Sequence, residues 1–236
     1  MISERTTQII AIDGPAASGK STIGRIVAET LGYLFLDTGC MYRAITLAAL
    51  QAGIQVEDEA AVAELAQTID IDVKPAAGEV DGRHYTTLLD GQDVTWQLRS
   101  PDVDAHVSQV SSYLDVRKEL VRRQREFGQR GPVIMVGRDI GTVVVPDAPL
   151  KLYITASAEE RARRRWLDRQ AQGHDTSYEA ILEDVLRRDK IDSSRQHAPL
   201  RPAEDAILID TTNRTVDSIV KEILALIRAR TPATTS

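Results

Sequence analysis

The chain has 236 residues, 42% hydrophobic and 27% charged, which is the composition of a globular protein with one large domain or one domain carrying an insertion. Its net charge of −6 argues against a generally basic nucleic-acid binder, and no apolar run approaches the ~20 residues of a membrane span. The single cysteine, Cys40, excludes an internal disulfide and a cysteine-rich zinc site. Residues 1–8 lack a signal-peptide core, so we expect a cytoplasmic monomer without nucleic-acid or membrane partners.

The first part of the chain alternates short apolar segments with helical patterns. In chain order we predict a strand, a helix, a strand and two helices, over residues 8–13, 21–31, 33–36, 41–52 and 58–68. Residues 69–100 differ in character, because polar and apolar residues alternate around an Asp90–Gly91 turn. This pattern predicts a small antiparallel β insertion. Between residues 45 and 110 the chain carries twelve acidic and three basic residues.

The second part of the chain resumes the alternation of helices and strands. Two helices are predicted between Pro101 and Phe127, with a break at 111–113, and strands over 132–136, 150–155 and 206–210. Ser157 to Glu160 and Thr176 to Glu179 have the pattern of capping boxes, which predicts helices starting at both places. The first of these helices extends to about Gln172. The second is expected to bury Ile181, Leu182, Val185 and Leu186, and a last helix is predicted over 215–230. Strands separated by helices favour an α/β fold with a parallel sheet covered on both faces.

Residues Gly14 to Ser21 read GPAASGKS and match the phosphate-binding pattern G-x-x-x-x-G-K-[ST]. The match lies between a predicted strand and a predicted helix, which is the context that the motif requires. Its glycines let backbone N–H groups surround phosphate oxygens, and the helix N-terminus adds positive potential. We therefore predict a nucleoside triphosphate site in which Lys20 reaches the β- and γ-phosphates and Ser21 ligates Mg²⁺. The residues of this predicted site are Gly14, Pro15, Ala16, Ala17, Ser18, Gly19, Lys20, Ser21 and Thr22.

Other classes of nucleotide-binding protein fit the sequence less well. It has no Asn-Lys-x-Asp sequence of the kind that reads guanine in GTPases, and the strand over 132–136 leads into Arg138–Asp139 instead of an Asp-Glu pair. Fourteen arginines and three lysines lie between residues 117 and 195, and the guanidinium fork fits phosphate oxygens. Thirteen carboxylates share this stretch, so a solvated helical surface is the alternative interpretation. The length of the chain and the arginines of this stretch together favour an enzyme that transfers a γ-phosphoryl group to a small acceptor.

Four segments make the sequence resemble the bacterial cytidylate kinases. They are LDTGCMYRA (36–44), VGRDIGTVVVPDAPLK (136–151), SAEERARRR (157–165) and RRDKIDSSRQHAPL (187–200). The resemblance implies ATP-dependent phosphorylation of CMP and dCMP, with ATP and the monophosphate as partners and Mg²⁺ as cofactor. It also implies a P-loop kinase fold forming one domain over 1–236. Its regions are a core of about 8–36, 101–156 and 196–230, an acceptor-binding region of about 37–100 that includes the insertion of about 69–100, and a helical lid of about 157–195.

The same resemblance assigns roles to residues outside the phosphate-binding loop. It implies that Arg43 holds the acceptor's phosphate beside Thr38 and Tyr42, that Arg138 serves the phosphate side, and that Ser108 and Arg117 complete cytosine recognition. It implies that Arg188, Asp192 and Arg195 contact sugar and phosphate, and their spacing places them on one face if the helix continues, although a surface salt-bridge ladder has the same spacing. In the lid, at least one of Arg161, Arg164 and Arg165 is expected to reach the transferring phosphates.

Asp139 is implied to help read the base. A carboxylate accepts a hydrogen bond from the N4 amino group of cytosine, whereas uracil presents a carbonyl oxygen at that place. A structural ion pair between Arg138 and Asp139 is the alternative interpretation of these two residues.

Two further functions stay open at this point. The first alternative is a P-loop kinase for another small acceptor, such as UMP, AMP or shikimate. The second is a nucleotide-binding regulatory ATPase. The sequence identifies no carboxylate that ligates Mg²⁺ directly.

Overall fold

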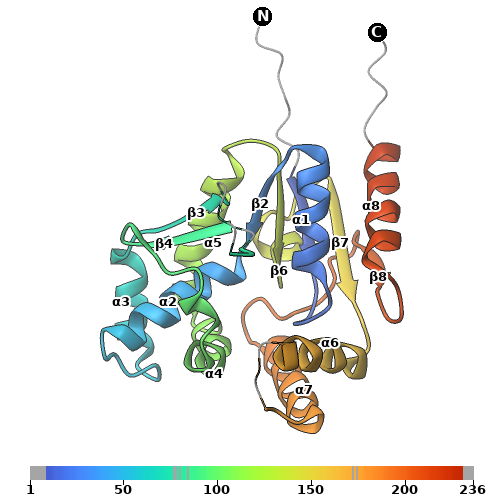
Figure 1. Cartoon of the computed structure of the whole chain (residues 1–236). Helices are drawn as coiled ribbons and strands as arrows, with labels where there is room; N and C mark the ends of the chain where they lie inside the picture. Colours follow the sequence, from blue (N-terminus) through green and yellow to red (C-terminus); the bar gives the residue numbers. More distant parts are fainter. Residues whose placement is uncertain are drawn as a thin grey trace, which may run out of the picture.

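Residues 9–76, 79, 81–83, 85–171, 173 and 175–230 are described by the computed structural model (Figure 1). Two residues at the ends of predicted elements, Gln8 and Gln172, lie outside these ranges, and so does His84 within the predicted β insertion. The predicted elements are otherwise found where the sequence places them, with boundaries that shift by one or two residues.

Five parallel strands form the central sheet in the order β2-β6-β1-β7-β8. Their bounds are β1 Ile9–Asp13, β2 Leu34–Asp37, β6 Val133–Gly137, β7 Leu150–Thr155 and β8 Ile207–Asp210. All five point the same way, so their carboxyl ends meet at one edge of the sheet. This edge is where ligands bind in open α/β folds.

Alternate residues of β1 face the two sides of the sheet. Ala11 packs into a cluster with Leu36, Met135 and residues of α2 (Gly39–Gln51) and α5 (Leu114–Gly128). Ile10 and Ile12 pack into a second cluster on the opposite face, with residues of α1 (Lys20–Leu31) and α8 (Val216–Arg230). The prediction of a parallel sheet covered by helices on both faces is therefore confirmed.

A second sheet confirms the predicted β insertion. It has three antiparallel strands in the order β3-β4-β5, with bounds Ile71–Pro75, Tyr85–Leu89 and Gln92–Asp93. Asp90 and Gly91 both have positive φ, as the two-residue turn between β4 and β5 requires. Helix α3 (Glu59–Thr68) precedes this sheet, and a short 3₁₀ helix, η1 (Gln97–Arg99), follows it.

Three helices and a turn complete the surroundings of the sheet's carboxyl edge. Helix α4 (Pro101–Val110) packs against α2, and the break between α4 and α5 lies where the sequence predicts it. Helices α6 (Ala158–Ala171) and α7 (Tyr178–Ser194) pack against each other beyond the ends of β6 and β7 (Figure 1). A single π-helical turn, η2 (Ile140–Val144), which the sequence did not indicate, follows β6.

Helix α7 corrects two details of the sequence analysis. Its N-cap is Ser177, whose Oγ accepts from the N–H of Ala180, and not Thr176. Ile181 and Val185 are buried as predicted, but the side chain of Leu186 is 52% exposed. The prediction for Leu186 is wrong because α7 buries one stripe of residues, Ile181, Val185, Arg188 and Asp192, and Leu186 lies outside it.

Candidate active site

A cleft of about 460 Å³ opens at the carboxyl edge of the central sheet. It is lined from the phosphate-binding loop, the end of β2, helices α2, α4 and α5, the end of β6, and helices α6 and α7. The cleft brings together these predicted residues: Ala16, Ala17, Lys20, Ser21, Thr38, Tyr42, Arg43, Ser108, Arg117, Arg138, Asp139, Arg165, Arg188, Asp192 and Arg195. Residues up to 179 positions apart in the sequence thus share one site. Arg161 and Arg164 do not line it.

The loop from Gly14 to Gly19 connects β1 to α1 and has the strained geometry of a phosphate cradle. A Cβ atom on Gly14 would lie 1.9 Å from the carbonyl oxygen of Ile154, so only glycine fits there. Ala17 and Gly19 have φ angles of 58° and 89°, in the left-handed region. Such a backbone is maintained at functional sites, where it turns N–H groups toward a bound anion.

Lys20 is the first residue of α1 and is buried. Its Nζ donates a hydrogen bond of 2.9 Å to the carbonyl oxygen of Pro15 within the same loop. Burial lowers the pKa of Lys20 to about 7, and the charge of Arg138 adds to this effect, while Asp37 and Asp192 oppose it. A negative charge close to such an amine favours its charged form and raises its pKa.

Asp37, at the end of β2, is a site residue that the sequence analysis missed. Its Oδ2 accepts a hydrogen bond of 2.7 Å from the Oγ of Ser21, and its Oδ1 accepts one of 3.1 Å from the N–H of Gly39. A hydroxyl and a carboxylate oxygen at the phosphate-binding loop are the ligands that Mg²⁺ prefers. The available sequence signal was an aspartate at the carboxyl end of a parallel strand.

Asp13, also missed, joins the phosphate-binding loop to the segment after β6. It ends β1, and its two carboxylate oxygens accept from the N–H groups of Ile140 and Gly141, at 2.7 and 2.8 Å. Burial raises the pKa of Asp13 to about 6 despite these two bonds. The contact fixes the start of η2 and with it the position of the preceding Asp139.

Arg117 and Asp139 form a buried ion pair on the acceptor side of the cleft, with side chains 5% and 6% exposed. The pair joins NH2 of Arg117 to Oδ2 of Asp139. Arg117 also donates to the carbonyl oxygen of Ser111 at 3.0 Å, and its guanidinium lies 5.7 Å from the centre of the Tyr42 ring. Among the described residues, no hydrogen bond engages Oδ1 of Asp139, which is therefore available to a ligand.

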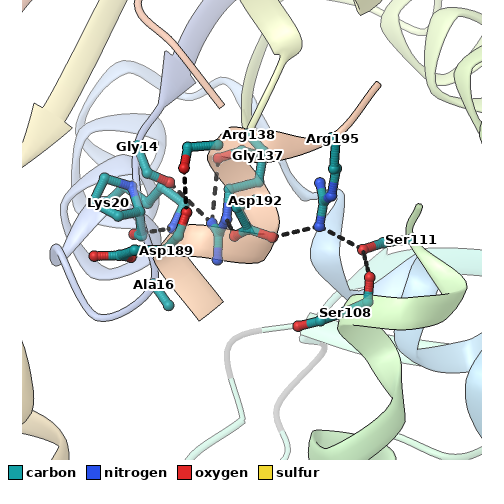
Figure 2. Close-up of polar contacts among 12 residues, drawn as sticks. Gly14, Ala16, Lys20, Ser108, Ser111, Gly137, Arg138, Asp189, Asp192 and Arg195 are labelled. Carbon is teal, nitrogen blue, oxygen red and sulfur yellow. Dashed lines mark hydrogen bonds and ion pairs between the residues drawn. The ribbon is translucent and has the colours of Figure 1, made fainter. Parts of the chain in front are cut away.

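A second polar network crosses the cleft from the phosphate-binding loop to α4 (Figure 2). Arg138 donates to Oδ2 of Asp192 at 2.9 Å and to the carbonyl oxygen of Gly14 at 3.0 Å. Arg195 bridges Asp192 and the Oγ of Ser111, the latter at 2.7 Å. Ser111, missed by the sequence analysis, thus connects both arginines of the acceptor side, Arg195 through its hydroxyl and Arg117 through its carbonyl.

The three arginines of α6 lie in different surroundings. Arg161 pairs with Asp189 of α7 at 2.5 Å and donates to the carbonyl oxygen of Ala16 at 3.3 Å. Arg164 donates to the carbonyl oxygen of Thr211 at 2.6 Å, and one of its guanidinium nitrogens lies 3.7 Å from where a Cβ on Gly19 would be. These two lie beside the phosphate-binding loop, whereas Arg165 lines the cleft near Asp104.

A fourth group of contacts surrounds Asp104 of α4, which the sequence analysis did not single out. Arg43 of α2 and Arg169 of α6 each reach its carboxylate at 2.7 Å, and Arg165 reaches it at 3.2 Å.

Within the described part of the chain, no group of three or more His, Cys, Asp or Glu side chains is placed to hold a metal ion. None of the described helices is long and apolar enough to cross a membrane.

The sequence model of the family described as cytidylate kinase matches residues 10–229. The chain belongs to the cytidylate kinase family. It is 46% identical over 222 residues to the cytidylate kinase of Bacillus velezensis, covering 94% of this chain and 96% of that one. With the cytidylate kinase of Bacillus pumilus it shares 49% identity over 215 residues, covering 91% and 93% of the two chains. The family makes the chain a phosphotransferase whose acceptor is a phosphate group.

Among solved structures, an uncharacterized protein from Eubacterium ventriosum has a similar fold. It superposes with a TM-score of 0.52 at 15% identity, covering 95% of this chain and 99% of that one. At this identity the likeness concerns the fold alone.

Proposed function

We propose that the chain transfers the γ-phosphoryl group of ATP to CMP and dCMP, which yields CDP or dCDP and ADP. The observation that carries this proposal is a single cleft that holds the phosphate-binding lysine, Lys20, and the Arg117–Asp139 pair. Lys20 is suited to a triphosphate, and Oδ1 of Asp139 is suited to the amino group of cytosine.

On the donor side, residues 14–22 bind the triphosphate through backbone N–H groups and the Nζ of Lys20. Ser21 and Asp37 would hold Mg²⁺, because their oxygens lie 2.7 Å apart at the loop. The ion neutralises the charge of the phosphate oxygens when it is bound. Lys20 leaves the carbonyl oxygen of Pro15 for the phosphates, and its pKa rises as it does so.

On the acceptor side, Arg43 and Arg138 hold the phosphate of CMP. Asp139 accepts from N4 of the base beside Arg117 and Ser108, and Tyr42 and Thr38 line the same part of the cleft. The sugar lies against the α7 residues, Arg188 and Asp192, and against Arg195. The Nε of Arg195 is buried and has no hydrogen-bond partner within the described residues.

The chemistry follows from charge and position. An oxygen of the CMP phosphate attacks the γ-phosphorus in line, the bond to the β-phosphate oxygen breaks, and no phosphoenzyme forms. The attacking oxygen is already ionised, so no carboxylate is needed to remove a proton. The enzyme supplies alignment and positive charge, from Lys20 on the donor and from the arginines around both phosphates.

Helices α6 and α7 form the lid, over residues of about 157–195, beside an acceptor-binding region of about 37–100. Arg161 and Arg164 contact the transferring phosphates on closure, because they already lie at Ala16 and Gly19 of the loop. Closure excludes water, which would otherwise hydrolyse ATP.

The test is an assay for ADP release from MgATP over a panel of CMP, dCMP, UMP and AMP, with Lys20→Ala as the inactive control. We expect release that depends on CMP or dCMP and is far weaker with UMP and AMP. ADP release of equal rate with and without a monophosphate would contradict the proposal and favour an ATPase.

A further inference from the structure

Asp104 lies at the centre of an arginine cluster on the acceptor side of the cleft. Its Oδ1 lies 2.7 Å from Arg43, and its Oδ2 lies 2.7 Å from Arg169 and 3.2 Å from Arg165. The backbone carbonyl oxygen of the same residue accepts a hydrogen bond of 2.6 Å from Arg188. One residue thus contacts four guanidinium groups.

These four arginines come from three different helices. Arg43 belongs to α2, Arg165 and Arg169 belong to α6, and Arg188 belongs to α7. All four line the cleft, and the side chain of Asp104 is only 15% exposed. Asp104 is therefore the place where the acceptor-binding helices α2 and α4 touch the two helices proposed as the lid.

The carboxylate of Asp104 reduces the mutual repulsion of the arginines in this cluster. Four guanidinium groups without a carboxylate between them repel one another and turn toward solvent. Asp104, together with Asp184, which pairs with Arg165 at 2.9 Å and also with Arg187 at 2.5 Å, offsets part of the charge of the four arginines. The positive charge that remains complements a phosphate monoester, which is a dianion at neutral pH. Although burial opposes it, the neighbouring Arg43 and Arg188 hold the pKa of the Asp104 carboxyl below its ordinary value, which keeps it ionised.

We propose that Asp104 is a positioning residue of the acceptor-phosphate site, which holds Arg43, Arg165 and Arg169 in the arrangement that receives the phosphate of the nucleoside monophosphate. The proposal rests on the function proposed above. Asp104 does not touch the substrate; it acts through the arginines, and it fixes α6 over the acceptor when the lid closes.

The test compares Asp104→Asn with the wild type in steady-state kinetics, varying CMP at saturating MgATP and then MgATP at saturating CMP. We expect kcat/KM for CMP to fall about 10- to 100-fold, mainly through a higher KM, since a misplacement of about 1 Å has effects of this size. KM for MgATP should stay within about twofold of the wild type, because the ion pairs and side-chain hydrogen bonds of Asp104 join it to arginines of α2, α6 and α7 and not to residues 14–22.

Asp102→Asn is the matched control. Asp102 lies in the same first turn of α4 and is exposed, and its side chain has no ion pair or hydrogen bond among the described residues. The substitution removes the same charge from the same helix end and should leave both KM values within about twofold. Asp104→Glu, which keeps the charge but moves the carboxylate by one methylene, should have a loss between those of Asn and the wild type.

An unchanged or lower KM for CMP in folded Asp104→Asn would overturn the proposal, and so would an equal rise of the KM for CMP and for MgATP. If Asp104→Asn does not fold, a kcat/KM for CMP in Asp104→Glu equal to that of the wild type would overturn it. Failure of the wild type and of Asp102→Asn to phosphorylate CMP would instead refute the proposed function.

Discussion

Replacing Asp139 with asparagine tests how the site distinguishes cytosine from uracil. Oδ2 of Asp139 accepts a hydrogen bond from Arg117, and no described residue donates to Oδ1. The carboxylate accepts from the N4 amino group of CMP but faces the O4 lone pairs of UMP at the same place. The asparagine amide removes the charge and is able to donate to O4, so Asp139→Asn should lose more activity with CMP than with UMP.

The expected fall in the CMP/UMP ratio of kcat/KM follows from the loss of one well-placed contact to a base. Such a contact is worth about 1–3 kcal/mol, or about 5- to 150-fold in this ratio. The same substitution weakens the buried pair with Arg117. A hydrogen bond to a charged group contributes about 1.5–3 kcal/mol. For a chain of this size each kcal/mol lowers Tm by about 2–4 °C, so Tm should fall by about 3–12 °C.

The assay measures kcat/KM for CMP and for UMP in the wild type and in Asp139→Asn, with thermal unfolding in parallel. Asp147→Asn serves as the control, because Asp147 is exposed and follows in the same segment of the chain. A smaller CMP/UMP ratio in Asp139→Asn supports direct reading of the base. An unchanged ratio in a folded variant would refute it and leave Asp139 to orient Arg117.

Four further outcomes follow from the site. Lys20→Ala should lower kcat by about 10²–10³-fold in a folded protein, and wild-type turnover would disprove the donor site. Burial lowers the pKa of Lys20 to about 7, and a bound phosphate should raise it again, so MgATP binding above about pH 7 should take up protons. Calorimetry in buffers of different ionisation enthalpy measures this uptake, and its absence would contradict a phosphate contact by Lys20. Asp37→Asn should raise the free Mg²⁺ needed for half-maximal activity by about tenfold or more, and an unchanged requirement would remove Asp37 from the metal site. Amide hydrogen exchange in α6 should slow more with a bisubstrate analogue than with ATP alone, and equal exchange in the free and doubly liganded enzyme would exclude a lid.

The parts of the site that the sequence predicted are carried by local patterns. GPAASGKS lies between a strand and a helix that are both evident from their apolar spacing, so the cradle and the place of Lys20 follow directly. The Asp90–Gly91 turn predicted the hairpin in the same way, because the two residues tolerate positive φ. The acceptor residues were found through the resemblance and not through spacing.

Two of the residues that were missed, Asp13 and Asp104, act across long sequence separations. Asp13 holds amides 127 and 128 positions away, and Asp104 meets Arg165 after 61 residues. Nothing in the sequence near an aspartate shows which arginine will face it, since that depends on how α4, α6 and α7 pack. The capping error at Ser177 has a local cause, because Thr176 and Ser177 are both good N-cap residues.

The most direct test of the central claim is the stoichiometry of product formation. Purified protein is incubated with MgATP and CMP, and CDP and ADP are quantified by chromatography over the same time course. The account predicts one CDP for each ADP, with almost no ADP when CMP is omitted. ADP that accumulates without CDP would contradict phosphoryl transfer to CMP.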